Sequence, residues 1–324
     1  MESSPQATVA VRCQRARSAR GDDLELSYHG AMDVVSGTLC CGHNAGFFSN
    51  CTVTLWNLAE VLQAGQPWPQ RIDFSRAFSA YRSPLGEGAD LYPVFFEPPR
   101  TAMPDGRRRL PRVKHHGLYR FVPYGSLAPI MEHYFRPSVA VRSLEQHLIE
   151  RHGIDLARTI AVVYRGTDKV AEVRLAEPEA YLAQTRTLLA RHPAHRVLIQ
   201  TDERAVRDLF CETFGDRCFF LPEMPVSGGG IAVHDLADEA LQMHRTDFGA
   251  LLVAVTHLLS RAAIVVNHTG NMALWICLWR GHCRGVEQFD DTGGFVDLRS
   301  AAYYQRRLAH TLRRACRKLG LSTS

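Results

Sequence analysis

The second half of the chain alternates short apolar runs with longer segments of helical periodicity. An apolar run bounded by turn residues is typical of a strand buried in a parallel sheet. Such runs predict strands over residues 159–164, 196–200, 218–221, 263–267 and 283–287. Helical patterns lie between them, over residues 178–192, 204–214, 247–260 and 271–280. This alternation predicts a parallel sheet with helices on both faces.

The first half carries a shorter pattern of the same kind. A predicted strand over residues 33–39 leads into a glycine-containing loop with His43, Asn44 and Gly46, and a helix then runs to about Ala64. A helix N-terminus directs N–H groups at whatever lies before it, so this loop is a candidate ligand contact. An ordinary connection between strand and helix explains the same residues equally well.

Other segments give less specific patterns. Short strands are predicted at residues 71–74 and 92–96, and a helix is predicted over residues 137–151. A last helix, over residues 303–319, has leucines on one side and many arginines on the other. Such a helix can lie on a membrane or on nucleic acid, but we expect it to pack by its apolar face.

Size and composition indicate a two-domain globular protein. The chain has 324 residues, of which 46% are hydrophobic and 22% charged, and its net charge of +5 suits an anionic ligand without requiring nucleic acid. We predict a disordered basic tail at residues 1–24, domains at residues 25–155 and 156–300, and a basic amphipathic helix at residues 301–324. The nine cysteines include no Cys-x-x-Cys pair, which favours reduced thiols, a cytoplasmic location and no zinc site.

Polar residues follow three of the predicted strands, and this is the candidate chemistry of the chain. Arg165, Asp168 and Lys169 follow the strand predicted at residues 159–164, and Thr201, Asp202 and Glu203 follow the strand at residues 196–200. Thr269, Gly270 and Asn271 follow the strand at residues 263–267. Loops that follow parallel strands emerge at the same edge of the sheet. Arginine grips phosphate with a planar fork, lysine adds a point charge, and a helix N-terminus favours anions. Together they predict a diphosphate site that uses no metal. Taken alone, the loop with Arg165, Asp168 and Lys169 is as well explained by a solvated salt bridge, and each of the three loops by itself is a weak signal.

These segments resemble the motifs of a known family, in the right order. Residues 164–169 are similar to the Arg-x-x-Asp-Lys motif of the α-1,6-fucosyltransferase and nodulation fucosyltransferase group, within a superfamily that includes protein O-fucosyltransferases. Residues 200–203 are similar to its second motif, a strand ending in Thr-Asp-Asp. Residues 258–266 and 269–271 are similar to its third motif, and the loop with Gly46 resembles its N-terminal glycine loop.

The resemblance implies a fold and an activity. It implies a GT-B architecture, with two Rossmann-like domains facing each other across a cleft. It also implies transfer of fucose from GDP-fucose to a glycan or other hydroxyl acceptor, with inversion at the sugar and without a required metal or other cofactor. No nucleic-acid partner and no membrane association are expected.

The resemblance also implies roles for individual residues. Arg165 would bind the β-phosphate with help from Lys169, and Asp168 would position their loop. Tyr181 falls where the family has a tyrosine near the nucleotide. The remaining donor-site residues, which would order the loops or donate to the diphosphate, are Thr201, Asp202, Glu203, Thr269, Gly270 and Asn271. Glu172 is the candidate general base.

Departures from the family motifs keep other functions open. Gly166 stands where the family has a second arginine, and the carboxylate expected in the third-motif helix falls near Val255, with Asp247 the nearest acid. A degenerate domain that binds a nucleotide or glycan without turnover therefore remains an alternative, as does another nucleotide sugar. A nicotinamide oxidoreductase is disfavoured, because no Gly-x-Gly-x-x-Gly follows any predicted strand.

Overall fold

The structure, a computed structural model, describes residues 32–35, 37–64, 67–99, 113–167, 173–227, 231, 233–236 and 238–318. The chain divides into two compact units that interleave along the sequence. Unit 1 comprises Met1–Val113, Pro123–Ser143 and Met243–Ala254, and unit 2 comprises Lys114–Val122, Leu144–Gln242 and Val255–Ser324. The single boundary expected at residues 155 and 156 stays a prediction.

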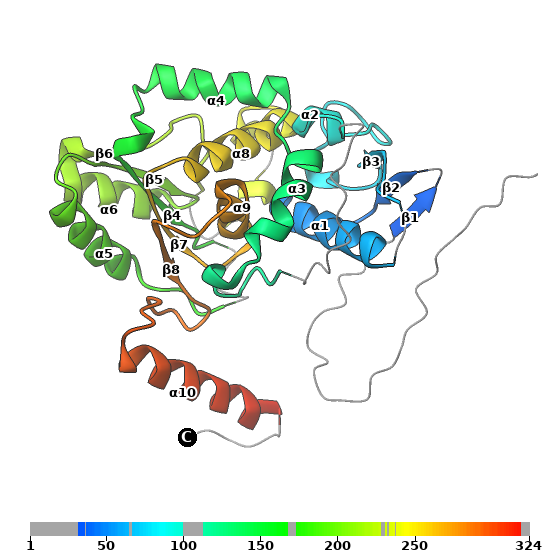
Figure 1. Cartoon of the computed structure of the whole chain (residues 1–324). Coiled ribbons are helices and arrows are strands. Elements are labelled where there is room, and N and C mark those ends of the chain that lie inside the picture. Colours follow the sequence, from blue (N-terminus) through cyan, green and yellow to red (C-terminus); the bar gives the residue numbers. More distant parts are fainter. Residues whose placement is uncertain are drawn as a thin grey trace, which may run out of the picture. The chain divides into compact units, whose positions relative to one another are not determined.

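Unit 2 contains the parallel sheet that the sequence predicts (Figure 1). Its strands are β4 (Thr159–Tyr164), β5 (Arg196–Thr201), β6 (Cys218–Phe219), β7 (Ile264–His268) and β8 (Val286–Phe289). They lie in the order β6-β5-β4-β7-β8, and all neighbouring pairs are parallel. The chain therefore builds outward from β4 on one side and then on the other, and the order reverses between β4 and β7. Open α/β sheets bind ligands at such a reversal.

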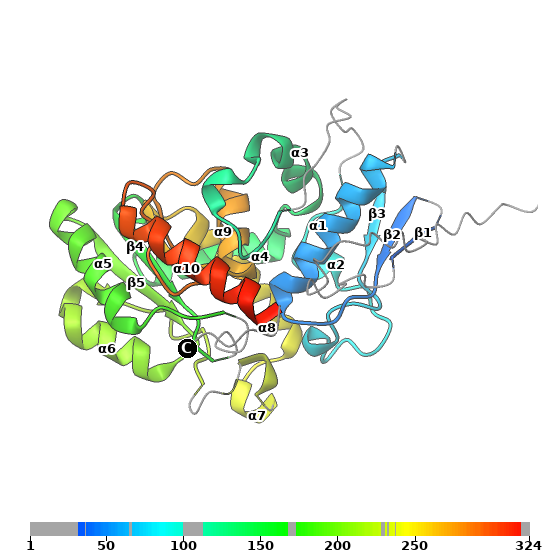
Figure 2. The same cartoon turned by 90° about the horizontal axis from the view of Figure 1, so that it is seen from below.

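Helices cover both faces of this sheet. The helices of unit 2 are α5 (Pro178–Arg191), α6 (Arg204–Phe214), α9 (Asn271–Arg280) and the short α7 (Asp238–Leu241), with parts of α4 (Val139–Arg151) and α8 (Arg245–Ser260). The helices α5 and α6 pack on a core that includes Ile160, Val162 and Val266, while α9 lies on the opposite face (Figures 1 and 2). The mixed α/β class with a parallel sheet is confirmed.

Local chemistry accounts for where several of these helices begin and end. Pro178 occupies the first turn of α5, where its missing N–H would have no partner in any case. The N–H of Gly281 donates to Cys277 and Leu278 at the end of α9, and its φ of 71° is the left-handed conformation that glycine adopts most easily. Short 3-10 turns lie at Ser79–Tyr81, Tyr119–Phe121, Leu156–Arg158, Gly215–Arg217 and Val233–Asp235.

Unit 1 differs from its prediction. Its described strands are β1 (Met32–Val35), β2 (Thr38–Cys41) and β3 (Arg71–Asp73), and its described helices are α1 (Phe47–Gln63), α2 (Tyr92–Phe95) and α3 (Tyr124–Tyr134), besides parts of α4 and α8. The pair β1–β2 is antiparallel and β2–β3 is parallel. A second Rossmann-like domain is therefore not confirmed by the described residues.

Two predictions for unit 1 are wrong for identifiable reasons. The strand expected at residues 33–39 is a hairpin, because the chain turns at Gly37 with a φ of 77°. The strand expected at residues 92–96 is the helix α2, with Pro93 in its first turn. The helix α3 was not predicted. The core here is aromatic, with Phe47 edge-on to Phe78 and Phe95 at 4.9 Å between ring centroids.

A buried charge cluster joins α4 and α8 within unit 2. The Glu145 carboxylate is 4% exposed, and it lies 2.6 Å from His257 Nδ1 and 2.7 Å from Arg261 Nη1. Burial alone would raise the pKa of Glu145, but the hydrogen bonds and charges of His257 and Arg261 outweigh it and hold that pKa below its usual range. The ionised carboxylate is therefore the stable form, and the cluster contributes to stability as long as it stays ionised.

We predict that Glu145→Gln lowers the free energy of unfolding by about 1–3 kcal/mol at pH 7, because the Arg261 charge loses its buried partner. A carboxylate whose pKa is lower in the folded state than in the unfolded state stabilises the fold at pH values above the unfolded pKa, which is about 4.3 for glutamate. This contribution is lost as the pH falls through the folded pKa. The difference between wild type and variant should therefore shrink below about pH 4. Urea denaturation across this range measures it, with Glu150→Gln on the same helix as the control. If the difference in free energy of unfolding between wild type and Glu145→Gln did not change with pH, the lowered pKa assigned to Glu145 would be contradicted.

Candidate functional site

The carboxyl ends of β4 and β5 are tied together by one buried carboxylate. Asp202 Oδ1 accepts the N–H of Gly166 at 3.1 Å, and Oδ2 accepts the hydroxyl of Thr167 at 2.7 Å. Oδ2 also lies 3.5 Å from Nε of Arg165, and the side chain of Asp202 is 9% exposed. The first three residues of the loop after β4 are thus all held by Asp202.

The turn that carries Asp202 is itself held on both sides. The backbone carbonyl of Asp202 accepts the N–H of Ser227 at 2.8 Å and the Ser227 hydroxyl at 3.1 Å. The hydroxyl of Thr201 accepts the N–H of Glu203 at 3.1 Å. A carboxylate set in a turn with so many internal bonds has little freedom to rotate. Asp202 is therefore a rigid anchor, and the guanidinium of Arg165, which is 33% exposed, is placed by it.

Glu203 lies over Gly166, where the resembled family has an arginine. A Cβ added at Gly166 would come within 1.8 Å of Glu203 Oε1 and 2.9 Å of Tyr164 Cε1. Burial raises the pKa of Glu203, and the neighbouring charge of Asp202 raises it further. The departure at this position therefore does more than remove a cation, since a carboxylate occupies the space that a side chain would need.

The turn before α9 is bonded to the chain around it. The N–H of Thr269 donates to the carbonyl of Phe289 at 3.0 Å, and the N–H of Gly270 donates to the hydroxyl of Tyr119 at 2.8 Å. The Thr269 hydroxyl donates to the carbonyl of His115 at 2.8 Å. A contact of these donors with a diphosphate stays a prediction, and it requires that Phe289 and Tyr119 be displaced. Asn271 opens α9 and is half-buried.

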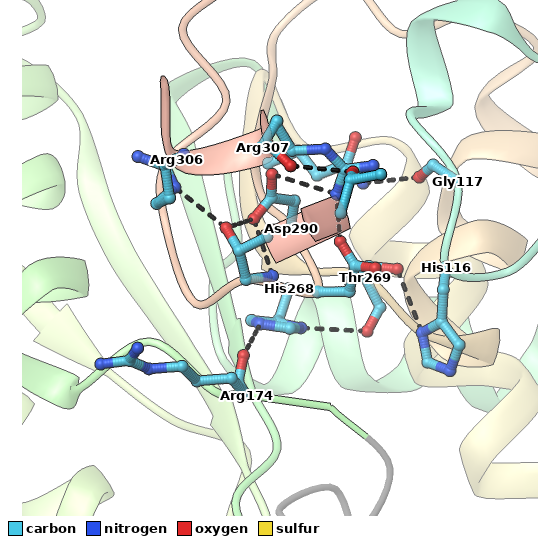
Figure 3. A network of polar contacts seen from close by, with 12 residues as sticks. His116, Gly117, Arg174, His268, Thr269, Asp290, Arg306 and Arg307 are labelled. Carbon is cyan, nitrogen blue, oxygen red and sulfur yellow. Dashed lines mark hydrogen bonds and ion pairs between the residues drawn. The ribbon is translucent and has the colours of Figure 1, made fainter. Parts of the chain in front are cut away.

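A polar network continues from this turn to the end of β8 (Figure 3). His268 Nδ1 lies 3.1 Å from the carbonyl of Thr269 and Nε2 lies 3.2 Å from the carbonyl of Arg174. Burial lowers the pKa of His268. Asp290, which is 1% exposed, accepts the N–H of Thr292 at 2.9 Å and lies 3.6 Å from Arg307 Nη1.

Sequence reasoning missed Asp290 as a residue of this edge. The last strand was expected over residues 283–287, whereas β8 spans Val286–Phe289. Asp290 therefore follows directly after the last residue of β8. Arg165, Asp202 and Thr269 follow β4, β5 and β7 in the same way. The sequence signal that could have placed Asp290 at the end of a strand is the apolar Phe289 directly before it. The polar residues Glu287 and Gln288 interrupt the apolar pattern of this strand and obscured that signal.

Tyr181 lies in the hydrophobic core of unit 2, on the helix α5. It is 1% exposed, and its ring packs on Tyr164 at 5.2 Å and on Phe289 at 4.3 Å between centroids. This is a place in the hydrophobic core beneath α5. In this structure the ring of Tyr181 packs against the strands, and its contact with a nucleotide stays a prediction.

Three predicted residues lie in unit 1. Asn44 accepts the N–H of Ser79 at 2.8 Å and donates to the carbonyl of Arg76 at 2.9 Å, so it fastens two loops together. His43 Nε2 lies 3.3 Å from the Ser49 hydroxyl, and burial lowers the pKa of His43. Gly46 is the N-cap of α1, which begins at Phe47. Their roles toward a donor stay predictions.

Some of the predicted chemistry lies outside the described residues. Asp168, Lys169 and Glu172 belong to this part of the chain. Within the described ranges, no group of three or more His, Cys, Asp or Glu side chains is placed to hold a metal ion. In the same ranges, no helix combines the length and the apolar character needed to span a bilayer.

Comparisons with known proteins return structures alone. No family model matches the chain, and no curated protein matches it. A structure of the NodZ α-1,6-fucosyltransferase soaked with GDP-fucose is 18% identical, with 54% of this chain and 53% of that chain covered and a TM-score of 0.35. A Se-Met structure of the fucosyltransferase NodZ from Bradyrhizobium is 17% identical, with 78% and 95% covered and a TM-score of 0.42.

A third structure, NodZ co-crystallised with GDP, is 19% identical, with coverages of 53% and 51% and a TM-score of 0.33. The chain thus spans about half the length of the structures soaked with GDP-fucose or crystallised with GDP. Identities and TM-scores this low do not by themselves assign an activity to the chain.

We predict that Gly166→Ala lowers the free energy of unfolding by about 1 kcal/mol or more, because the new methyl group displaces the Glu203 carboxylate. In a Glu203→Ala background the same change should cost less, with a coupling of about 0.5 kcal/mol or more. Chemical denaturation of the four proteins in the cycle measures this coupling. Gly125→Ala serves as the control, because its added Cβ meets no atom within 4 Å. Additive effects would mean that Glu203 does not fill the space over Gly166.

Proposed function

We propose that the chain is a glycosyltransferase that moves a sugar from a nucleotide diphosphate to a hydroxyl acceptor, with inversion and without a required metal. The resemblance of the motifs points to GDP-fucose as the donor. One observation carries the proposal: the three motifs follow β5, β4 and β7, which are adjacent strands of one parallel sheet. Motifs scattered along the sequence thus end at one sheet edge, at the reversal of strand order where such sheets bind ligands.

The proposed reaction is a single displacement. The acceptor oxygen attacks the anomeric carbon while the bond from that carbon to the β-phosphate oxygen breaks, and the nucleoside diphosphate leaves with the electron pair. Negative charge then grows on the β-phosphate. A guanidinium positioned beforehand stabilises this charge more in the transition state than in the bound substrate, which lowers the barrier.

Arg165 is the residue to which we assign this role. Its Nε lies 3.5 Å from Asp202, and the planar fork of a guanidinium can meet two phosphate oxygens at once. Because Asp202 is rigid, the cation needs little reorganisation when a donor binds. Lys169 is proposed to add a second positive charge. The proton of the acceptor hydroxyl passes to a general base, for which Glu172 remains the candidate from the sequence.

The second candidate function is a protein that binds a nucleotide or glycan without transfer. Two observations favour it: Glu203 places a carboxylate where the family has a cation, and the N–H groups of Thr269 and Gly270 already have partners in Phe289 and Tyr119. A carboxylate next to a diphosphate costs binding energy unless it is protonated or paired. Binding of a nucleotide with no release of sugar to any acceptor would support this alternative.

We predict that Arg165→Ala lowers transfer from GDP-fucose by about 100-fold or more, in line with the loss of a preorganised group at a developing charge. Arg165→Lys should restore part of the rate, because lysine keeps the charge but lacks the planar fork. Transfer of labelled fucose to a panel of glycans, with release of GDP, measures both.

Arg196→Ala is the matched control, because Arg196 begins β5 at the opposite end of the strand from Asp202. Its guanidinium packs on the ring of Phe219, so the change removes an arginine without touching the candidate site. Undiminished transfer by Arg165→Ala would remove Arg165 from the mechanism. Transfer lost equally in both variants would show an effect on folding.

A further inference from the structure

The terminal helix α10 (Ala301–Lys318) is docked on unit 2 by its polar side. Arg306 donates from Nε to the Thr292 hydroxyl at 2.9 Å and from Nη2 to the carbonyl of Phe295 at 2.7 Å. Arg307 pairs with Asp291, and its Nη1 lies 3.6 Å from Asp290 (Figure 3). Together with the buried ring of Tyr303, these contacts hold the helix against the loop that follows β8.

The apolar side of α10 is exposed. Tyr304, Leu308 and Leu312 are 56%, 61% and 56% exposed, and they recur every four residues, so they form one stripe along the helix. We call these three residues the α10 stripe. The expectation that this helix packs by its apolar face is therefore wrong. The reason is local: two arginines find carbonyl and carboxylate acceptors on the loop after β8, and they turn the leucines away from it.

The charged residues of α10 itself are all basic. Residues 298–324 contain no aspartate or glutamate, and they contain six arginines and one lysine. Arg306 and Arg307 are used in docking, whereas Arg313, which is exposed, follows the stripe directly.

We propose that α10 is a membrane-surface anchor that binds an anionic lipid bilayer. The α10 stripe would enter the boundary between headgroups and acyl chains, while the basic residues beside it meet lipid phosphates and carboxylates. Arginine side chains suit this position, because their apolar stems lie along the buried surface and their charged ends reach the headgroups. This inference does not rest on the proposed transferase activity.

Two other occupants fit the same observations less well. A second copy of the chain would pack stripe on stripe and would bring two uniformly positive helices together, which opposes association. A nucleic acid would meet the positive charge, but an aliphatic pair such as Leu308 and Leu312 contributes nothing to phosphate contacts. An anionic bilayer is the partner that uses the apolar stripe and the positive charge at once.

The test is co-sedimentation of the full chain with vesicles of phosphatidylcholine alone and of a phosphatidylserine–phosphatidylcholine mixture. We expect about tenfold or more stronger binding to the anionic vesicles, with binding falling as salt is raised, because the attraction is screened. Leu308→Gln combined with Leu312→Gln should abolish the binding. Arg313→Gln should weaken it and should reduce its dependence on salt.

The control is Val139→Gln, which changes a residue that is 66% exposed and lies outside α10. The two leucines are also exposed, so unchanged melting temperatures should accompany every variant. Failure to bind either kind of vesicle would overturn the proposal, as would binding that the leucine substitutions leave intact. A dimer in sedimentation velocity that the same substitutions dissociate would instead assign the α10 stripe to a second copy. None of these results depends on turnover of a nucleotide sugar.

Discussion

The buried carboxylate of Asp202 is the constraint on which the candidate site depends. An ionised carboxylate removed from water must find donors and a counter-charge nearby, or the fold loses the energy of burying it. Asp202 finds them in the residues that follow the neighbouring strand: the N–H of Gly166, the hydroxyl of Thr167 and the guanidinium of Arg165. The ends of β4 and β5 are therefore coupled, and the chemistry proposed for Arg165 is possible because that residue is held rather than free to sample solvent.

The central part of the fold could be predicted because burial on both faces leaves a plain signal. The strands β4 and β5 are buried almost throughout, and each contains an unbroken apolar run. Their observed bounds differ from the predicted ones by one residue at most. The sequence pattern of a strand is weaker where the strand is only partly buried. The edge strand β8 carries Glu287 and Gln288, and its prediction was displaced toward the preceding turn. In unit 1, aromatic residues near Pro93 suggested a strand, whereas the helix α2 packs the same rings into a core formed by distant segments.

The site was predictable as a set of loops but not as a set of contacts. That Arg165, Asp202 and Thr269 follow strands of one sheet could be inferred from the order of the elements. The sequence could not reveal that Glu203 would cover Gly166, or that Tyr119 would bond the turn before α9, because those contacts join segments far apart in the chain. The orientation of α10 was unpredictable for a similar reason. Its pattern shows that it is amphipathic, but the acceptors that hold Arg306 and Arg307 lie on another segment.

The central claim is that this edge of the sheet binds a nucleoside diphosphate, and calorimetric titration of the purified chain with EDTA present tests it most directly. GDP, GDP-fucose, UDP and ADP would be titrated separately, and the thermal stability of each mixture would be followed in parallel, since a ligand of the folded state raises it by mass action. The account predicts saturable binding of GDP and GDP-fucose without metal, and weaker binding of UDP and ADP. The absence of binding by all four nucleotides would contradict the diphosphate site, and the three loops would then be structural.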